Sequence, residues 1–135
     1  QYQRLDIAGL EEFEARGVYY GATPMEANLC GGAEVAVVGA GNSAGQGALH
    51  LAGIARRVHV VYRRADIRET MSEYLVRRLE EHPAITLHPE TEIVALHGDA
   101  SGRLAEASFR NRASGETVRC ECGFLFMFIG AAPHT

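Results

Sequence analysis

Three apolar runs along the chain are continuous rather than alternating, which predicts strands buried on both faces. They are Val35–Val38, Val58–Tyr62 and Phe124–Ile129, and the last is the most apolar stretch, as expected for a central parallel strand. Shorter apolar runs at Val18–Tyr20 and Ala84–Leu87 indicate two further strands. Buried strands of this kind are typical of a parallel sheet covered on both faces, so the predicted fold class is α/β.

Helical periodicity occurs in two segments. The first follows Val38 and extends to about Ala55, joining two predicted strands into a βαβ unit. In the second, Thr70 and Glu73 form a capping-box pattern, which predicts that Thr70 caps the helix. A brief helix is also expected over Met25–Cys30. The apolar positions of the second segment recur on one face: Met71, Tyr74, Leu75 and Leu79.

After Leu87 the pattern changes to alternation of apolar and polar positions. The segments Glu92–His97, Leu104–Arg110 and Thr117–Cys122 predict three antiparallel strands separated by turns that contain glycine. This meander lies where a second crossover helix would otherwise be. The sequence therefore predicts a parallel sheet in which a three-stranded antiparallel β-meander replaces one crossover.

A G-x-G-x-x-A turn connects the first continuous strand to the Ala-rich helix: Gly39, Ala40, Gly41, Asn42, Ser43 and Ala44. Gly39 allows a tight turn, Gly41 has no Cβ to obstruct a pyrophosphate, and Ala44 lets the helix pack close to the strand. Unpaired N–H groups at the helix N-terminus favour an anion. An ordinary Gly-rich turn is the alternative, but the strand–turn–helix context favours a Rossmann-like FAD/NAD(P)-binding fold.

The end of the second continuous strand indicates which dinucleotide binds. An NAD site usually places a carboxylate there for the ribose 2′-hydroxyl, whereas this chain has Arg63, Arg64 and then Arg68. Guanidinium groups pair with phosphate, so the three arginines are predicted to bind the 2′-phosphate of NADPH. The alternatives are a solvated basic loop, or Asp66 acting as a displaced ribose ligand.

Composition narrows the function classes. The 135 residues are 47% hydrophobic, enough for one domain with a buried core. A net charge of −4 without a basic arm excludes nucleic acid as a main partner, and no apolar run reaches the roughly 18 residues of a membrane span. Because the chain begins at Gln1 without a methionine, we expect it to be a piece of a longer protein.

The cysteines and histidines carry no recognisable site pattern. Cys30, Cys120 and Cys122 form no C-x-x-C, and buried or incidental thiols are favoured over a redox or metal role. Free thiols fit a reducing cytoplasm. The six histidines lack ligand spacing, and His59 is expected to be a packed residue rather than a catalyst. No metal site and no catalytic side chain are predicted.

Five segments carry a common pattern: GVYYGAT (17–23), EVAVVGAGNSAGQ (34–46), VHVVYRRADIR (58–68), TMSEYLVRRLE (70–80) and FMFIGAAPHT (126–135). Through these segments nearly the whole chain resembles the NADPH-binding domain of the thioredoxin reductase-like flavoproteins. The resemblance implies that residues 1–24 are a linker segment from a neighbouring FAD domain and that 25–135 form the NADPH-binding domain. It also implies contacts from Gln46 to the pyrophosphate and ribose, and from Ile129 and Gly130 near the nicotinamide.

The resemblance implies a domain that brings NADPH to the FAD of the parent protein. In the family, the reduced flavin then passes electrons to a disulfide. The family's C-A-T-C falls on Gly21–Pro24, which has no cysteine, so the usual dithiol chemistry is not expected there. The final acceptor is left open between a thioredoxin-like disulfide, a quinone, ferredoxin and oxygen, and the parent can be a homodimer. The alternatives are a non-catalytic NADPH-sensing module and a structural domain with a vestigial site. The isolated domain is expected to bind nucleotide without turnover.

Overall fold

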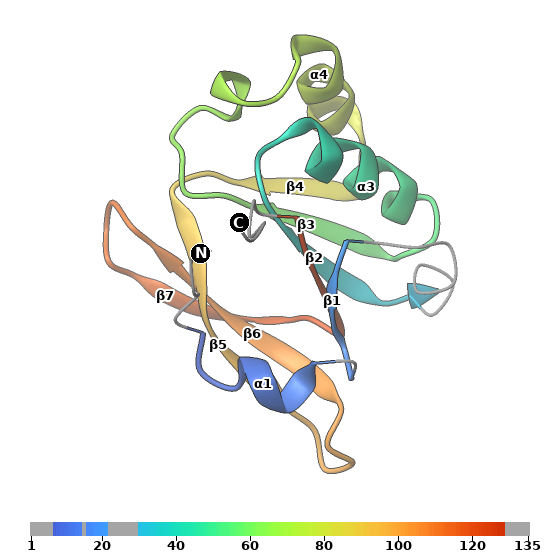
Figure 1. The fold of residues 1–135 in the computed structure, drawn as a ribbon, viewed down its shortest axis with the longest axis vertical. Coiled ribbons are helices and arrows are strands. Elements are labelled where there is room, and N and C mark those ends of the chain that lie inside the picture. The colour runs from blue at the N-terminus through green and yellow to red at the C-terminus, as the bar shows by residue number, and fades with distance from the viewer. Residues whose placement is uncertain (1–6, 15, 22–29, 129–135) are drawn as a thin grey trace, which may run out of the picture.

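The computed structural model describes residues 7–14, 16–21 and 30–128. Its main element is a parallel sheet of five strands in the order β1-β8-β2-β3-β4 (Figure 1). The predicted parallel sheet is confirmed, and the apolar run after Gly123 lies inside it as β8, between β1 and β2. The strands span Val18–Tyr20 (β1), Glu34–Val38 (β2), Arg57–Val61 (β3), Ile85–His88 (β4) and Phe124–Met127 (β8).

The predicted meander is a separate antiparallel sheet in the order β5-β6-β7. It comprises β5 (Thr91–Gly98), β6 (Leu104–Asn111) and β7 (Thr117–Glu121). Figure 1 shows the meander on one side of the parallel sheet and the helices α3 (Asn42–Ala52) and α4 (Glu73–Glu81) on the other. The domain is therefore built of three layers, with the parallel sheet in the middle.

Both faces of the parallel sheet are buried, as its continuous apolar runs predict. Alternate residues of each strand face opposite layers, so two hydrophobic clusters form. Val37, Val60 and Phe126 belong to the cluster beneath the helices, and all three are 0% exposed. Ala36 and Leu125, also 0% exposed, belong to the cluster beneath the meander. Each outer layer therefore packs on its own face of the parallel sheet through a separate hydrophobic cluster.

The predicted helix cap at Thr70 is wrong. α4 begins at Glu73, and the Oγ of Ser72 accepts a hydrogen bond from the Leu75 N–H at 3.3 Å. Thr70 instead donates its hydroxyl to the carbonyl oxygen of Ala40 at 2.6 Å. A tertiary hydrogen bond to the glycine-rich turn therefore replaces the local cap that the capping-box spacing indicates. The earlier helix also ends at Ala52, before Gly53, rather than near Ala55.

The acidic segment near the N-terminus, expected to be a linker, contains a short helix, α1 (Leu10–Phe13). Phe13 is 2% exposed and packs with the cluster beneath the meander, so this segment contributes to the core of the domain. The proposed boundary at residue 24 stays a prediction, and the helix expected over Met25–Cys30 falls mainly outside the described residues. Within the described part of the chain, no helix has the length and apolarity to cross a membrane.

Candidate functional site

A cavity of about 520 Å³ opens where the carboxyl ends of β2 and β3 meet the meander. In open α/β sheets, ligands bind beyond the carboxyl ends of the strands. The cavity is therefore in the position expected for a nucleotide site. Its lining comprises Ile7, Val38, Gly39, Ala40, Val61, Tyr62, Arg63, Arg64, Thr91–Val94 and Arg110.

The glycine-rich turn has the geometry that its sequence predicts. Gly39 has φ of +149°, and a Cβ there would lie 3.2 Å from both Ala44 Cβ and the backbone of Phe128. A Cβ on Gly41 would meet nothing within 4 Å. Gly41 is also the N-cap of α3, and among the residues that the structure describes no side-chain cap bonds to that helix end. The backbone N–H groups there are available to an anion.

The other residues at the turn either hold it in place through a hydrogen bond or are exposed to solvent. Asn42 Oδ1 accepts a hydrogen bond from the Ser72 N–H at 2.8 Å. Together with the bond from Thr70 to Ala40, this contact fixes the turn to the segment before α4. Ser43 and Gln46 are exposed on α3, and Ala44 is buried. Ile129 and Gly130, expected near the nicotinamide, lie outside the described residues.

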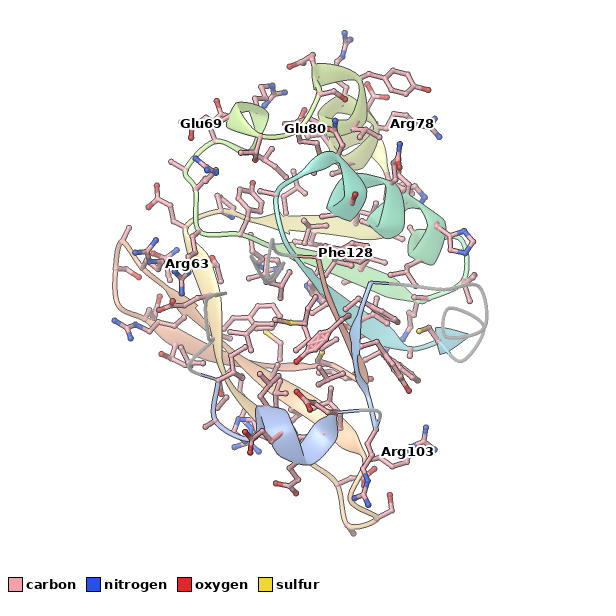
Figure 2. All side chains as sticks on the ribbon, in the orientation of Figure 1. Arg63, Glu69, Arg78, Glu80, Arg103 and Phe128 are labelled. Atoms are coloured by element: carbon pink, nitrogen blue, oxygen red, sulfur yellow. The ribbon has the colours of Figure 1, made fainter. Side chains whose placement is uncertain are left out.

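The structure brings two of the three predicted arginines into the cavity. Arg63 and Arg64 line it, and Figure 2 shows Arg63 beside the meander. Arg64 donates to Glu69 at 2.9 Å. Arg68 is not among the lining residues of the cavity.

Hydrogen bonds to α4 and within the segment after β3 hold Arg68 and Asp66 in place. Arg68 donates to Glu73 at 2.7 Å and to Glu80 at 3.1 Å, both on α4, and these hydrogen bonds raise the pKa of Arg68. Asp66, the alternative ribose ligand, accepts from the Arg68 N–H at 2.9 Å and is likewise absent from the lining. Both side chains thus serve the local structure after β3.

Sequence reasoning missed two charged residues of the cavity, Glu92 and Arg110. They lie on β5 and β6 and are direct partners in the register of the meander. The pattern of single strands gives no signal for this pairing, because it depends on which strands are neighbours and in which register.

The thiols are packed as predicted. Cys30 and Cys122 are 0% exposed, and Cys120 is partly buried against the same cluster as Cys122. Burial raises the pKa of Cys122 to about 12, so its thiol stays protonated and unreactive at neutral pH. The residues that the structure describes contain no group of three His, Cys, Asp or Glu side chains placed to hold a metal.

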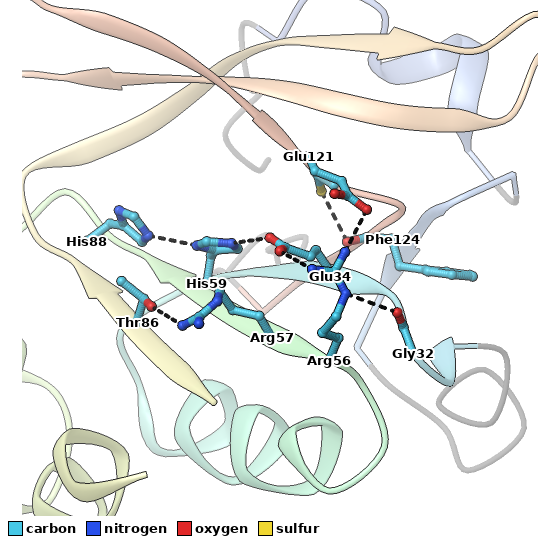
Figure 3. A network of polar contacts seen from close by, with 10 residues as sticks. Gly32, Glu34, Arg56, Arg57, His59, Thr86, His88, Glu121 and Phe124 are labelled. Atoms are coloured by element: carbon cyan, nitrogen blue, oxygen red, sulfur yellow. Dashed lines mark hydrogen bonds and ion pairs between the residues drawn. The ribbon is translucent and has the colours of Figure 1, made fainter. Parts of the chain in front are cut away.

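A polar network lies on the meander side of the parallel sheet and joins three adjacent strands (Figure 3). The His59 ring is bound through Nε2 to Glu34 and through Nδ1 to the Nε2 of His88, both at 2.9 Å. Arg56 bridges Glu34 at 2.8 Å and Glu121 at 2.9 Å. His59 is 8% exposed, which confirms it as a packed residue. The network is a structural link between the sheets.

This network predicts a loss of stability in acid. Burial, together with the neighbouring His59, lowers the pKa of His88 to about 4. Between about pH 6.5 and pH 4 the unfolded chain takes up a proton on His88 that the folded chain does not. The free energy of unfolding is therefore unaffected above that range and falls as the pH decreases through it. Allowing for the partial exposure of the ring, we expect a loss on the order of 2 kcal/mol.

Urea unfolding at several pH values from 7 to 4 measures this loss. His88→Gln removes the titrating ring and should show a shallower decline than the unaltered chain. His50→Gln, which changes an exposed histidine of α3, should not. Equal slopes for the His88 variant and the unaltered chain would show that His88 does not cause the decline.

Comparisons with known proteins agree with this fold. Residues 34–112 match the family model described as pyridine nucleotide-disulphide oxidoreductase. The chain is 34% identical over 98% of its length to NADPH-dependent thioredoxin reductase 3 of Arabidopsis thaliana, and 30% identical over 100% to an NADH dehydrogenase of Bacillus subtilis. It spans 25% and 26% of those two proteins. The structure of thioredoxin reductase from Giardia duodenalis is similar with a TM-score of 0.89 and 30% identity, covering 100% of this chain and 42% of that one. These matches confirm the resemblance and the Rossmann-like fold.

Proposed function

This chain belongs to the pyridine nucleotide-disulphide oxidoreductase family, and from that premise we propose that it is the NADPH-binding domain of a thioredoxin reductase-like flavoenzyme, where it delivers hydride from NADPH to FAD. The observation that carries the proposal is the cavity, which is lined both by Arg63 and Arg64 and by the first residues of the glycine-rich turn, Gly39 and Ala40. Relatives of similar identity are named for NADPH and for NADH, so the choice of nucleotide depends on residues of this chain.

Each part of the site suits one part of the nucleotide. The uncapped N-terminus of α3 and the open space above Gly41 accommodate a pyrophosphate. The cavity accommodates the adenosine, with Arg63 and Arg64 at its 2′-phosphate, and Arg68 is proposed to support them from the short 3-10 helix Ile67–Glu69. The exposed Ser43 and Gln46 face solvent along α3, where they can reach the pyrophosphate and ribose. Ile129 and Gly130 are proposed to lie near the nicotinamide.

When bound, NADPH supplies the hydride, and the side chains of this domain position it. FAD is proposed to bind a neighbouring domain of the parent protein, since the chain spans only about a quarter of its first two relatives. A thioredoxin-like disulfide or another acceptor is the proposed electron partner. Buried or partly buried cysteines without a disulfide suit a reducing compartment, and the cytoplasm is the proposed location.

Calorimetric titration with NADPH and then with NADH tests the proposal. We expect NADPH to bind at least about tenfold more tightly, because only NADPH brings a phosphate to the arginines. Equal affinity for NADPH and NADH would show that the arginines do not determine which of the two nucleotides the domain prefers. Failure of both nucleotides to bind would contradict the proposed function.

A non-catalytic NADPH-sensing module is the second candidate. It is favoured by the absence of cysteine from Gly21–Pro24, where the family's redox thiols would fall. The absorbance spectrum of the purified parent protein distinguishes the two, because the enzyme carries a flavin and a sensing module has no need of one.

A further inference from the structure

The cavity contains a carboxylate as well as arginines. Glu92 lies between two guanidinium groups, with Oε1 3.4 Å from Arg63 and Oε2 3.9 Å from Arg110. Its side chain is 23% exposed, whereas those of Arg63 and Arg110 are 55% and 51% exposed. The acid is thus the more buried member of the cluster, and the two cations reach toward solvent and the cavity.

The ion pairs of Glu92 are longer than others on the same surface. Charge-assisted hydrogen bonds are usually about 2.7–2.9 Å long. The pair between Arg119 and Glu106, elsewhere on the meander, is 2.7 Å. The pairs of Glu92 exceed this length, so Glu92 holds neither Arg63 nor Arg110 by a short bond, and both guanidinium groups can turn toward another anion in the cavity.

The position of Glu92 and Arg110 follows from the fold. They face each other across β5 and β6, where opposite charges stabilise an antiparallel pair. The meander places this pair opposite the end of β3, and Arg63 and Arg64 line the same cavity. One carboxylate therefore opposes a cluster of three cations in a single pocket.

Building on the proposed function, we propose that Arg110 is a further ligand of the 2′-phosphate and that Glu92 limits how strongly the cavity prefers a phosphorylated ribose. Without nucleotide, Glu92 balances part of the charge of Arg63 and Arg110. With nucleotide, both arginines turn to the phosphate, which carries nearly two negative charges, and Glu92 repels it. Glu92 thus lowers the selectivity of the site for NADPH over NADH.

The test uses 2′,5′-ADP and 5′-AMP, which differ only in the 2′-phosphate and have no nicotinamide half. We expect Glu92→Gln to tighten binding of 2′,5′-ADP roughly three- to tenfold, and Arg110→Gln to weaken it by a similar factor. Binding of 5′-AMP should change less than about twofold in both variants. The double variant should bind 2′,5′-ADP with an affinity between those of the single variants.

Glu106→Gln and Arg119→Gln are the matched controls, because they remove the same charges from a cross-strand pair outside the cavity. Neither should alter the ratio of the two affinities. If the unaltered chain binds neither nucleotide, the proposed function fails and this inference with it. If the unaltered chain prefers 2′,5′-ADP but Glu92→Gln leaves the ratio unchanged, only the inference is overturned. Weaker 5′-AMP binding by Glu92→Gln would instead make Glu92 a ribose ligand and would also overturn it.

Discussion

Replacing Arg63 and Arg64 together by alanine is expected to weaken NADPH binding about a hundredfold, while NADH binding changes less than about threefold. Both side chains line the cavity and are about half exposed, so each can reach a phosphate there. A hydrogen bond between charged groups contributes about 1.5–3 kcal/mol, and exposure to solvent places these two near the lower end. NADH has no 2′-phosphate and loses neither contact.

Calorimetric titration of the variant with both nucleotides measures the effect. Arg77→Ala with Arg78→Ala is a matched control, since it removes two adjacent arginines of α4 that are absent from the cavity lining. The ion pairs broken in the test variant, to Glu92 and Glu69, are at the surface and contribute at most about 1 kcal/mol each to stability. An equal loss of affinity for NADPH and NADH would show that these arginines do not recognise the 2′-phosphate.

Alanine substitutions at the two glycines of the turn are expected to have different effects: Gly39→Ala should destabilise the fold, and Gly41→Ala should weaken nucleotide binding. Gly39→Ala should destabilise the fold by about 2–4 kcal/mol, because its φ is positive and the new Cβ meets Ala44 and the Phe128 backbone. Gly41→Ala should leave the free energy of unfolding within about 0.5 kcal/mol, since φ is −91° and the Cβ meets nothing. That Cβ occupies the space proposed for the pyrophosphate, so nucleotide affinity should fall about a hundredfold.

Urea unfolding and nucleotide titration of both variants separate these roles, and each variant is the control for the other. A stable Gly39→Ala protein would mean that the turn can relax around a side chain. Full nucleotide affinity in Gly41→Ala would mean that the pyrophosphate does not approach the turn at this residue, and would count against the proposed binding mode.

The sequence determined the elements and their class because the signals for them are local. Continuous apolar runs identify the parallel strands, alternation after Leu87 identifies the meander, and the glycines identify the turn between β2 and α3. Arg63 and Arg64 could be identified as candidate site residues because they come shortly after β3, at the carboxyl end of a recognisable strand. Each of these depends on residues adjacent or nearly adjacent in the chain.

Tertiary structure decided the contacts between distant segments. Thr70 and Ser72 brace the glycine-rich turn instead of forming the predicted cap, because the turn offers the Ala40 carbonyl and the Asn42 side chain across the layer. Glu92 and Arg110 enter the cavity only through the pairing of β5 with β6 and the packing of the meander against the parallel sheet. Phe13 likewise belongs to the core only because α1 packs on the hydrophobic cluster between the meander and the parallel sheet. Hydrophobic periodicity specifies which face of an element is buried, whereas strand register and layer packing decide which polar groups meet.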